Sequence, residues 1–460
     1  MAYEKKKVFD VLSDEELQEL DRFSSEYIEF LSKSKTERLA VKEIVRRAEA
    51  AGFVALSEAL KKERLLPGDR IYAVNHHKGA ALFVLGQDLT QGMDIVGAHL
   101  DSPRLDLKPM PLYEDGNLAL LRTHYYGGIK KYHWTNLPLA LHGVIYTKSG
   151  EQVEISIGED PQDPVFYIND LLIHLSKDQL QKKADEVVTG EQLNIVIGHN
   201  SRGMDRECKE PVKEHILQML KEKYGIEEDD FQIAEIEAVP AGPAREVGLD
   251  RALIAGHGHD DRVCSFAGLS GILSVEKPER TAVALFVDKE EIGSVGNTGM
   301  TSRFFENVVA ELLNHIRPVY SELDLRRAMA CSRVLSADVN TAYDPCFPEV
   351  VERSNAAAMG CGVCLSKYTG SRGKGGSNDA NAEFLNEVRQ IFDRHGVVWQ
   401  TGELGAVDQG GGGTIAYILA EYGAQVVDCG TGMLSMHAPI ELVSKADAYE
   451  TYRAYKAFLS

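Results

Sequence analysis

The sequence predicts an α/β fold: a mixed sheet flanked by helices, with a second, β-rich domain inserted into it. In the outer parts of the 460-residue chain, short and almost continuous apolar runs alternate with helical patterns. This alternation is typical of strands that are buried on both faces of a parallel or mixed sheet. From about residue 110 to 247, strands instead alternate by two and are joined by hairpin signals. The chain is also long enough for two or three domains.

Composition and charge restrict the class of function. The chain is 44% hydrophobic and 26% charged, as a globular protein with a sizeable core should be. Its net charge of −20 argues against a nucleic-acid or anionic-membrane partner, which would need a basic face. The opening residues MAYEKKKVFD lack the apolar stretch of a signal peptide, and no apolar run is long enough to cross a bilayer. We therefore expect a cytoplasmic protein.

The cysteines do not suggest a disulfide framework. There are seven of them, an odd number scattered over a long chain. Cys361 and Cys364 form one C-x-x-C without the second pair that a zinc ribbon needs. We interpret both as small buried hydrophobic residues, with a redox role as the alternative.

The first clear helix is TERLAVKEIVRRAEAAGF, residues 36–53. Thr36 can cap its start, and Gly52 suits the position just after its end. The apolar residues expected on its inner face are Leu39, Ile44 and Val45.

Strands and helices follow one another in the outer parts of the chain. Apolar runs that end in polar residues predict strands within 93–99, 251–261, 281–291, 332–340 and 424–430. Helical patterns are expected within 302–316, 377–396 and 412–423. These elements assign residues 1–109 and 248–460 to one discontinuous domain.

The middle of the chain, residues 110–247, predicts an inserted domain. Its clearest hairpin is VIYTKSGEQVEISIG (144–158), in which two alternating runs flank Ser149-Gly150. A helix is expected within residues 207–225.

Polar clusters at strand ends are the candidates for chemistry, because ligands in open α/β sheets bind outside the carboxyl ends of the strands. His99 and Asp101 are two residues apart, so an extended strand places both on one face. A histidine ligand whose ring is oriented by a carboxylate is a frequent metal-site pair, and a surface histidine near a turn is the alternative. Glu290 and Glu291 end another strand, where a solvated turn is the alternative.

Three further clusters add metal-binding groups. The stretch GHGHDDRV (256–263) is rich in histidine and aspartate, and a carboxylate there could bridge two cations. We interpret His257 and His259 as structural or ring-orienting residues rather than ligands. Asp338 ends the strand in LSADVN, and His437 follows the apolar segment of GMLSMHAP; each is weak alone.

Two glycine-rich stretches lack the spacing of nucleotide-binding loops. Residues 367–377 do not fit G-x-x-x-x-G-K-[ST], and residues 408–414 do not fit G-x-G-x-x-G after a strand. The five clusters together are the inventory of a two-metal hydrolytic site. Such a site also needs a free carboxylate that takes the proton of the attacking water.

These motifs identify a family resemblance. The chain resembles the M18 family of metallo-aminopeptidases, the aspartyl aminopeptidase family, over nearly its whole length. The motifs that carry the resemblance, in this order, are His99-x-Asp101-Ser102-Pro103, Asp260-Asp261, Asp288-x-Glu290-Glu291-Ile292-Gly293-Ser294, Ser336-Ala337-Asp338 and Met436-His437.

The resemblance implies two divalent cations, zinc first and manganese or cobalt as replacements. His99 and Asp338 would hold one of them, Glu291 and His437 would hold the other, and Asp260 would bridge the two.

The resemblance also implies the roles of the remaining site residues. Glu290 would be the general base, and Asp101 would orient His99. The fold would be that of a di-zinc exopeptidase, whose inserted domain mediates dimerisation and builds a dodecamer from dimers. His174, in DLLIHL (170–175), matches a histidine that reaches the active site of a neighbouring subunit.

One departure from the family pattern and two candidate residues concern the substrate. Relatives that prefer acidic residues have a histidine where this chain has Thr341. Lys367 and Lys374 are the candidates for binding an acidic side chain.

The sequence therefore predicts a metallo-aminopeptidase that acts on short peptides, with an acidic N-terminal residue as one candidate preference. Two rivals remain at this stage. One is another di-metal amidase, such as a deacylase or a carboxypeptidase. The other is a catalytically idle protein that forms a shell or binds cargo, for which broken ligand positions would be the signature.

Overall fold

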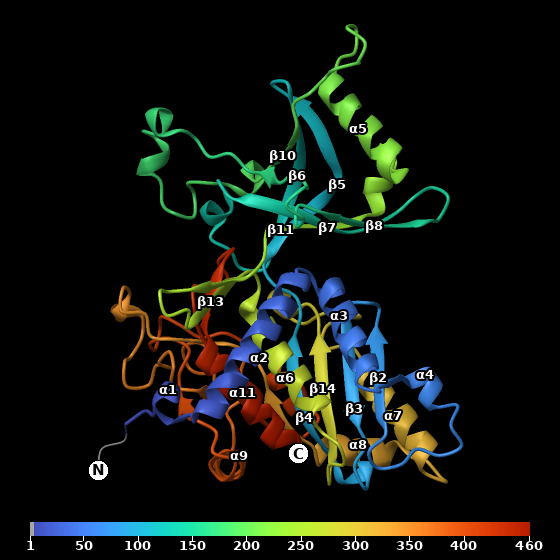
Figure 1. Ribbon diagram of the computed structural model, residues 1–460, viewed down its shortest axis with the longest axis vertical. Helices are drawn as coiled ribbons and strands as arrows, with labels where there is room; N and C mark the ends of the chain where they lie inside the picture. Colours follow the sequence, from blue (N-terminus) through green and yellow to red (C-terminus); the bar gives the residue numbers. More distant parts are fainter. Residues whose placement is uncertain (1–3) are drawn as a thin grey trace. The chain divides into compact units, whose positions relative to one another are not determined.

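The computed structural model describes residues 4–460, which form two compact units (Figure 1). One unit holds the described residues up to Asp101 together with Ala244–Met436 and Glu441–Ser460; the other holds Ser102–Pro243 and His437–Ile440. The inserted unit begins before the predicted residue 110, because β5 (Arg104–Asp115) pairs from its first residue with β6 (Leu118–Tyr126).

The first unit contains a nine-stranded mixed sheet. Its four central strands, β14, β4, β15 and β19, are parallel, and they are flanked by antiparallel neighbours β3 and β17. In spatial order the strands are β1 (Val54–Ala55), β2 (Arg70–Asn75), β3 (Gly79–Val84), β14 (Thr281–Val287), β4 (Met93–His99), β15 (Arg333–Ser336), β19 (Gln425–Gly430), β17 (Val363–Ser366) and β18 (Trp399–Thr401).

Helices cover both faces of this sheet, and alternate residues of each strand point into two separate cores. In β14, for example, Ala284 and Phe286 belong to one core, whereas Val283 and Leu285 belong to the other. The first core contains residues of α1 (Val8–Val11), α2 (Asp14–Lys33), α3 (Glu37–Ala50), α6 (His259–Leu273), α9 (Ala382–Arg394) and α11 (Lys445–Leu459). The second contains residues of α4 (Leu56–Ala59), α7 (Phe304–Ile316), α8 (Glu322–Ala330) and α10 (Ala416–Ala420).

A five-stranded sheet in the same unit organises the loops after the central strands. Its order is β12 (Arg245–Val247), β13 (Leu253–Gly256), β21 (Glu441–Ser444), β20 (Gly432–Leu434) and β16 (Asn340–Thr341). β13 leads into α6, and three residues separate the end of β15 from the start of β16. This sheet therefore fixes the start of α6 and the end of β15.

The inserted unit is built on a seven-stranded sheet of order β11, β5, β6, β10, β9, β7 and β8. β11 (Glu235–Pro240) also pairs with β7 (Pro138–Tyr146), so six strands form a closed ring and β8 (Gln152–Ile157) stays outside it. The remaining strands are β9 (Phe166–Tyr167) and β10 (Ile195–Gly198). The helix α5 (Pro211–Tyr224) packs against β5, β6 and β10.

Local sequence explains several element ends. The Thr36 hydroxyl accepts the N–H of Leu39 at the start of α3, and Gly52 after its end has φ +85°. Of the helix expected within 412–423, only the five residues of α10 are helical. The glycines before α10 favour other backbone conformations. Cys361 and Cys364 are buried, and both are free thiols. Among residues 4–460, no helix is long and apolar enough to cross a membrane.

Candidate metal centre

The candidate site lies at the carboxyl ends of the central parallel strands. Val287, the last residue of β14, pairs with His99, the last residue of β4. On the other side of β4, Gly97 pairs with Ser336, so Asp338, two residues farther along, reaches the height of His99. The parallel register therefore brings together motifs that lie far apart in the sequence.

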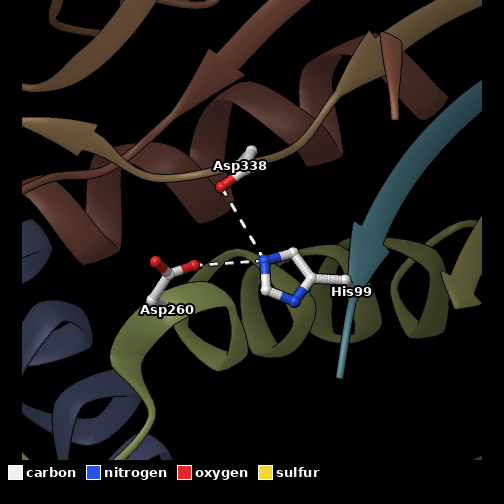
Figure 2. Close-up of side chains that lie close together, drawn as sticks. All are labelled: His99, Asp260 and Asp338. Atoms are coloured by element: carbon white, nitrogen blue, oxygen red, sulfur yellow. Dashed lines mark hydrogen bonds and ion pairs between the residues drawn. The ribbon is translucent and has the colours of Figure 1, made fainter. Parts of the chain in front are cut away.

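His99, Asp260 and Asp338 converge from three different elements (Figure 2). The Nε2 atom of His99 lies 3.1 Å from Oδ1 of Asp260 and 3.9 Å from Oδ1 of Asp338. His99 and Asp260 are buried, and Asp338 is partly buried. One potential ligand atom from each residue lies within 4.8 Å of the others.

Asp260 stands at the start of α6 but does not have helical geometry. Its φ and ψ are −78° and 106°, and its peptide bond to Asp261 is cis. The backbone N–H of Asp260 donates to Oε2 of Glu441, on β21, at 3.1 Å. Glu441 is itself buried, so the backbone of Asp260 is held by a buried group from a strand distant in the sequence.

On the other side of the ring, His99 contacts Asp101. Its Nδ1 lies 2.9 Å from the backbone carbonyl oxygen of Asp101 and 3.3 Å from Oδ1. The two carboxylate oxygens of Asp101 accept the backbone N–H groups of Glu290 and Glu291, each at 3.1 Å. Asp101 thus connects the histidine with the turn that carries the two glutamates.

Glu290 and Glu291 lie in a single turn of 3-10 helix, Glu290–Ile292. The chain leaves the strand before them, because Lys289 has φ +67°. Oε2 of Glu290 is 4.0 Å from Nε2 of His99. A carboxylate oxygen of Glu291 lies within 4.8 Å of one of Asp260. Because the chain turns before the two glutamates, both of them face the cluster.

The cluster concentrates negative charge in a buried place. Burial raises the pKa of Asp338 well above its usual range; His99 offsets part of this, whereas Asp261 and Asp260 add to it. Burial alone would lower the pKa of His99, but hydrogen bonds to Asp101 and Asp260 outweigh it, so this pKa is well above normal. Nearby carboxylates contribute to both pKa shifts, because they oppose further negative charge on Asp338 and favour positive charge on His99.

The donor set fits a divalent cation. One imidazole nitrogen and several carboxylate oxygens are ligands that zinc takes at about 2.0–2.2 Å. Ligand atoms around one such ion lie about 3–4 Å apart, and the three atoms contributed by His99, Asp260 and Asp338 lie within 4.8 Å of one another. A cation here would also neutralise the charge that shifts the two pKa values.

The sequence predicts four further site residues, Lys367, Lys374, His174 and His437. Lys367 and Lys374 each contact the carboxylate of Asp379. His174 and His437 belong to the inserted unit; His437 has φ +64°, and its Nδ1 is 2.9 Å from the carbonyl oxygen of Gly128.

Sequence reasoning missed two supporting contacts. Glu441 carries no signal beyond its place four residues after His437. Tyr27, on α2, donates its hydroxyl hydrogen to Nδ1 of His259 at 2.6 Å, and no pattern in the sequence predicts this pair. Burial lowers the pKa of His259 to about 3, so its ring is neutral and can accept the bond. This agrees with a structural role for His259.

Comparisons with known proteins identify the family of this chain. A family model described as aminopeptidase I zinc metalloprotease (M18) matches residues 30–459. A probable M18 family aminopeptidase 1 of Clostridium acetobutylicum is 51% identical over 459 residues, which cover 99% of this chain and 98% of that protein. The crystal structure of an M18 family aminopeptidase from Thermotoga maritima matches with a TM-score of 0.95 at 46% identity, covering 100% of both chains. A structure described as the dodecamer of S. cerevisiae mApe1 shares the fold, with a TM-score of 0.77 at 21% identity over 96% of this chain and 97% of that chain.

Proposed function

The chain belongs to the M18 family of metallo-aminopeptidases, and we propose that it removes N-terminal residues with two divalent cations and with Glu290 as the general base. The observation that carries this proposal is the convergence of His99, Asp260 and Asp338 beside the Glu290 carboxylate. The family establishes the hydrolysis of N-terminal residues by a metal-dependent enzyme. The number of ions and the role of each residue are the proposal.

In this proposal His99 and Asp338 would hold one cation, Glu291 and His437 would hold the other, and Asp260 would contribute to both. Imidazole and carboxylate ligands suit zinc, which the family description names, with manganese or cobalt as replacements. When bound, the cations would polarise the scissile carbonyl and make a water molecule more acidic.

The residues of the chain then move the proton. Glu290 takes a proton from the attacking water, the resulting hydroxide adds to the carbonyl carbon, and the C–N bond breaks. Glu290 returns the proton to the departing amine, so the products are a free amino acid and a shortened peptide. Asp101 supports this role because its carboxylate fixes the backbone of Glu290.

The test is Glu290→Gln, with amino-acid p-nitroanilides as substrates and elemental analysis of the purified protein. We expect kcat to fall at least about 100-fold while two metal ions per chain remain, because general acid–base catalysis contributes about 10²–10⁴-fold. A rate near that of the wild type would show that Glu290 is not the base. The matched control is Glu291→Ala, for which we expect the loss of one metal ion.

An acetylated substrate separates an aminopeptidase from other di-metal amidases. The proposed enzyme binds a free α-amine, so an N-acetylated peptide should not be cleaved at its first bond. Efficient cleavage of the acetylated peptide would indicate a deacylase or an endopeptidase activity instead.

A preference for an acidic N-terminal residue is a finer part of the proposal. Its support is the presence of Lys367 and Lys374, although both already contact Asp379. A substrate carboxylate would have to replace Asp379 at one of these lysines. A scan of p-nitroanilides decides the matter: higher kcat/KM for aspartate or glutamate than for leucine supports the preference, and the reverse order overturns it.

We also propose that the protein acts in the cytoplasm as a homo-oligomer, a dodecamer built from dimers. In the inserted unit, the segment that contains His174 exposes apolar side chains, with Ile173 67% and Leu175 68% exposed. Such a surface suits contact with another copy of the chain. Native mass spectrometry tests the assembly, and a species no larger than a dimer at micromolar concentration would contradict it.

A further inference from the structure

The segment from Asp288 to Thr298 forms a closed loop that carries both site glutamates. The backbone N–H of Asp288 donates to the carbonyl oxygen of Thr298 at 3.3 Å, and the Thr298 hydroxyl donates to Oδ2 of Asp288 at 2.6 Å. Glu290 and Glu291 lie between these two residues. We infer that Thr298 is a positioning residue for both glutamates and that it acts through Asp288 without touching the substrate.

Burial distinguishes the base of this loop from its tip. Asp288 is 1% exposed and Thr298 is 3% exposed, whereas Ile292 and Val295 at the tip are 50% and 69% exposed. Solvent-exposed loop tips impose little order of their own. The conformation of the loop therefore depends on the contacts of its buried residues. These are Asp288 and Thr298 at the base and Ser294, which is 3% exposed and whose carbonyl oxygen accepts the N–H and hydroxyl groups of Thr301.

The hydroxyl of Thr298 donates a hydrogen bond to the buried carboxyl group of Asp288. The Oδ1 atom of Asp288 is buried and receives no hydrogen bond within residues 4–460, so the Thr298 hydroxyl is the donor that satisfies the other carboxyl oxygen. Removing a donor from a buried carboxyl group is costly, and the structure can relieve that cost by opening the loop to water. Opening would displace the two glutamates.

Two neighbouring residues, Asn75 and Asp101, also hold the loop in place. From β2, the side-chain amide of Asn75 donates to the carbonyl oxygen of Asn297 at 2.9 Å, next to Thr298. At the other side of the loop, Asp101 accepts the N–H groups of Glu290 and Glu291. The turn is thus held both at its base and at its N–H groups. Loss of either support shifts a general base, for which a displacement of about 1 Å costs about 100-fold in rate.

The experiment compares Thr298→Val with Thr298→Ser, which keeps the hydroxyl group. Thr281→Val is the matched control, because Thr281 is 1% exposed and its hydroxyl accepts a backbone hydrogen bond at the start of β14, whereas the loop follows the end of that strand. The first readout is hydrogen exchange, followed by mass spectrometry, of peptides that cover residues 288–300. The second readout is kcat and KM with an amino-acid p-nitroanilide.

We expect Thr298→Val to speed exchange at residues 288–300 about 10-fold and to lower kcat about 10- to 100-fold, with KM changed less than about 3-fold. Thr298→Ser should restore both readouts to within about 3-fold of wild type. Thr281→Val should change neither readout, even where it lowers the unfolding temperature. Unchanged exchange or unchanged kcat in Thr298→Val overturns the inference, as does equal loss in Thr281→Val.

This inference rests on the proposed roles of Glu290 and Glu291, but the two can fail separately. If Glu290→Gln keeps a rate near wild type, the proposed base is wrong, and the exchange data still report whether Thr298 holds the loop. If Glu290→Gln is inactive while Thr298→Val is fully active, the base stands and the positioning role of Thr298 falls.

Discussion

The surroundings of Asp447 predict the direction and the size of a pH dependence in the free energy of unfolding. It lies on α11, is 0% exposed, and accepts the N–H groups of Gly360 and Gly362 at 2.7 Å each. Burial raises its pKa to about 7; the two N–H groups oppose this shift, and Glu450 adds to it. In the unfolded chain an aspartate has a pKa of about 3.9.

Between pH 4 and pH 7 the folded protein therefore keeps a proton that the unfolded chain has released. Stability contributed by this carboxyl group falls as pH rises through that interval, and it is lost above pH 7. From pH 5.5 to pH 7 the change is 1.5 pH units at about 1.4 kcal/mol each, or about 2 kcal/mol. Asparagine does not titrate, so Asp447→Asn removes this dependence.

The variant also loses a hydrogen bond, because its amide oxygen replaces only one of the two accepting oxygens of the carboxyl group and its NH₂ group faces an N–H donor. We expect Asp447→Asn to lower the free energy of unfolding by about 1–3 kcal/mol at pH 5.5. At pH 8.5 this loss should be about 2 kcal/mol smaller. Urea unfolding in the presence of a chelator, followed by the fluorescence of the two tryptophans, measures both costs. Equal costs at the two pH values would refute the raised pKa.

Three further predictions concern the site and its supports. Asp101→Asn keeps one acceptor for the two glutamate N–H groups, and a hydrogen bond to a charged group contributes about 1.5–3 kcal/mol. We therefore expect kcat/KM to fall at least about 10-fold, and wild-type kinetics would contradict this. Gly430→Ala would place a methyl group 1.9 Å from the carbonyl oxygen of Asp338, so elemental analysis should show weakened metal retention, and full metal content would speak against it. Tyr27→Phe leaves His259 without its donor, so urea unfolding should show a loss of about 1–3 kcal/mol with kcat within about 2-fold.

Much of the catalytic unit follows from sequence periodicity. The apolar run 93–99 is β4 over its full length, because a strand buried on both faces requires consecutive apolar residues and ends where a polar group emerges. That rule also brought His99 and Asp338 to the same sheet edge. Their convergence with Asp260 required the family resemblance, because its motif lies 161 residues from His99 in sequence.

The sequence could not supply contacts that depend on how loops fold back. The turn at Glu290 depends on the left-handed backbone of Lys289, a conformation that a lysine does not signal. Thr298 and Glu441 act through hydrogen bonds whose partners are known only once the strands are in register. Local patterns report which residues are buried, whereas these contacts depend on which distant residues are buried together.

The parallel centre of the sheet has a consequence for synthesis of the chain. β4 is complete at His99, but its two neighbours, β14 and β15, end only at Val287 and Ser336. At about 5–20 residues per second, the wait for β14 lasts about 10–40 s. The strands of the inserted unit all lie between these points and can pair with one another first. A nascent chain must therefore keep the apolar β4 from aggregating during this interval.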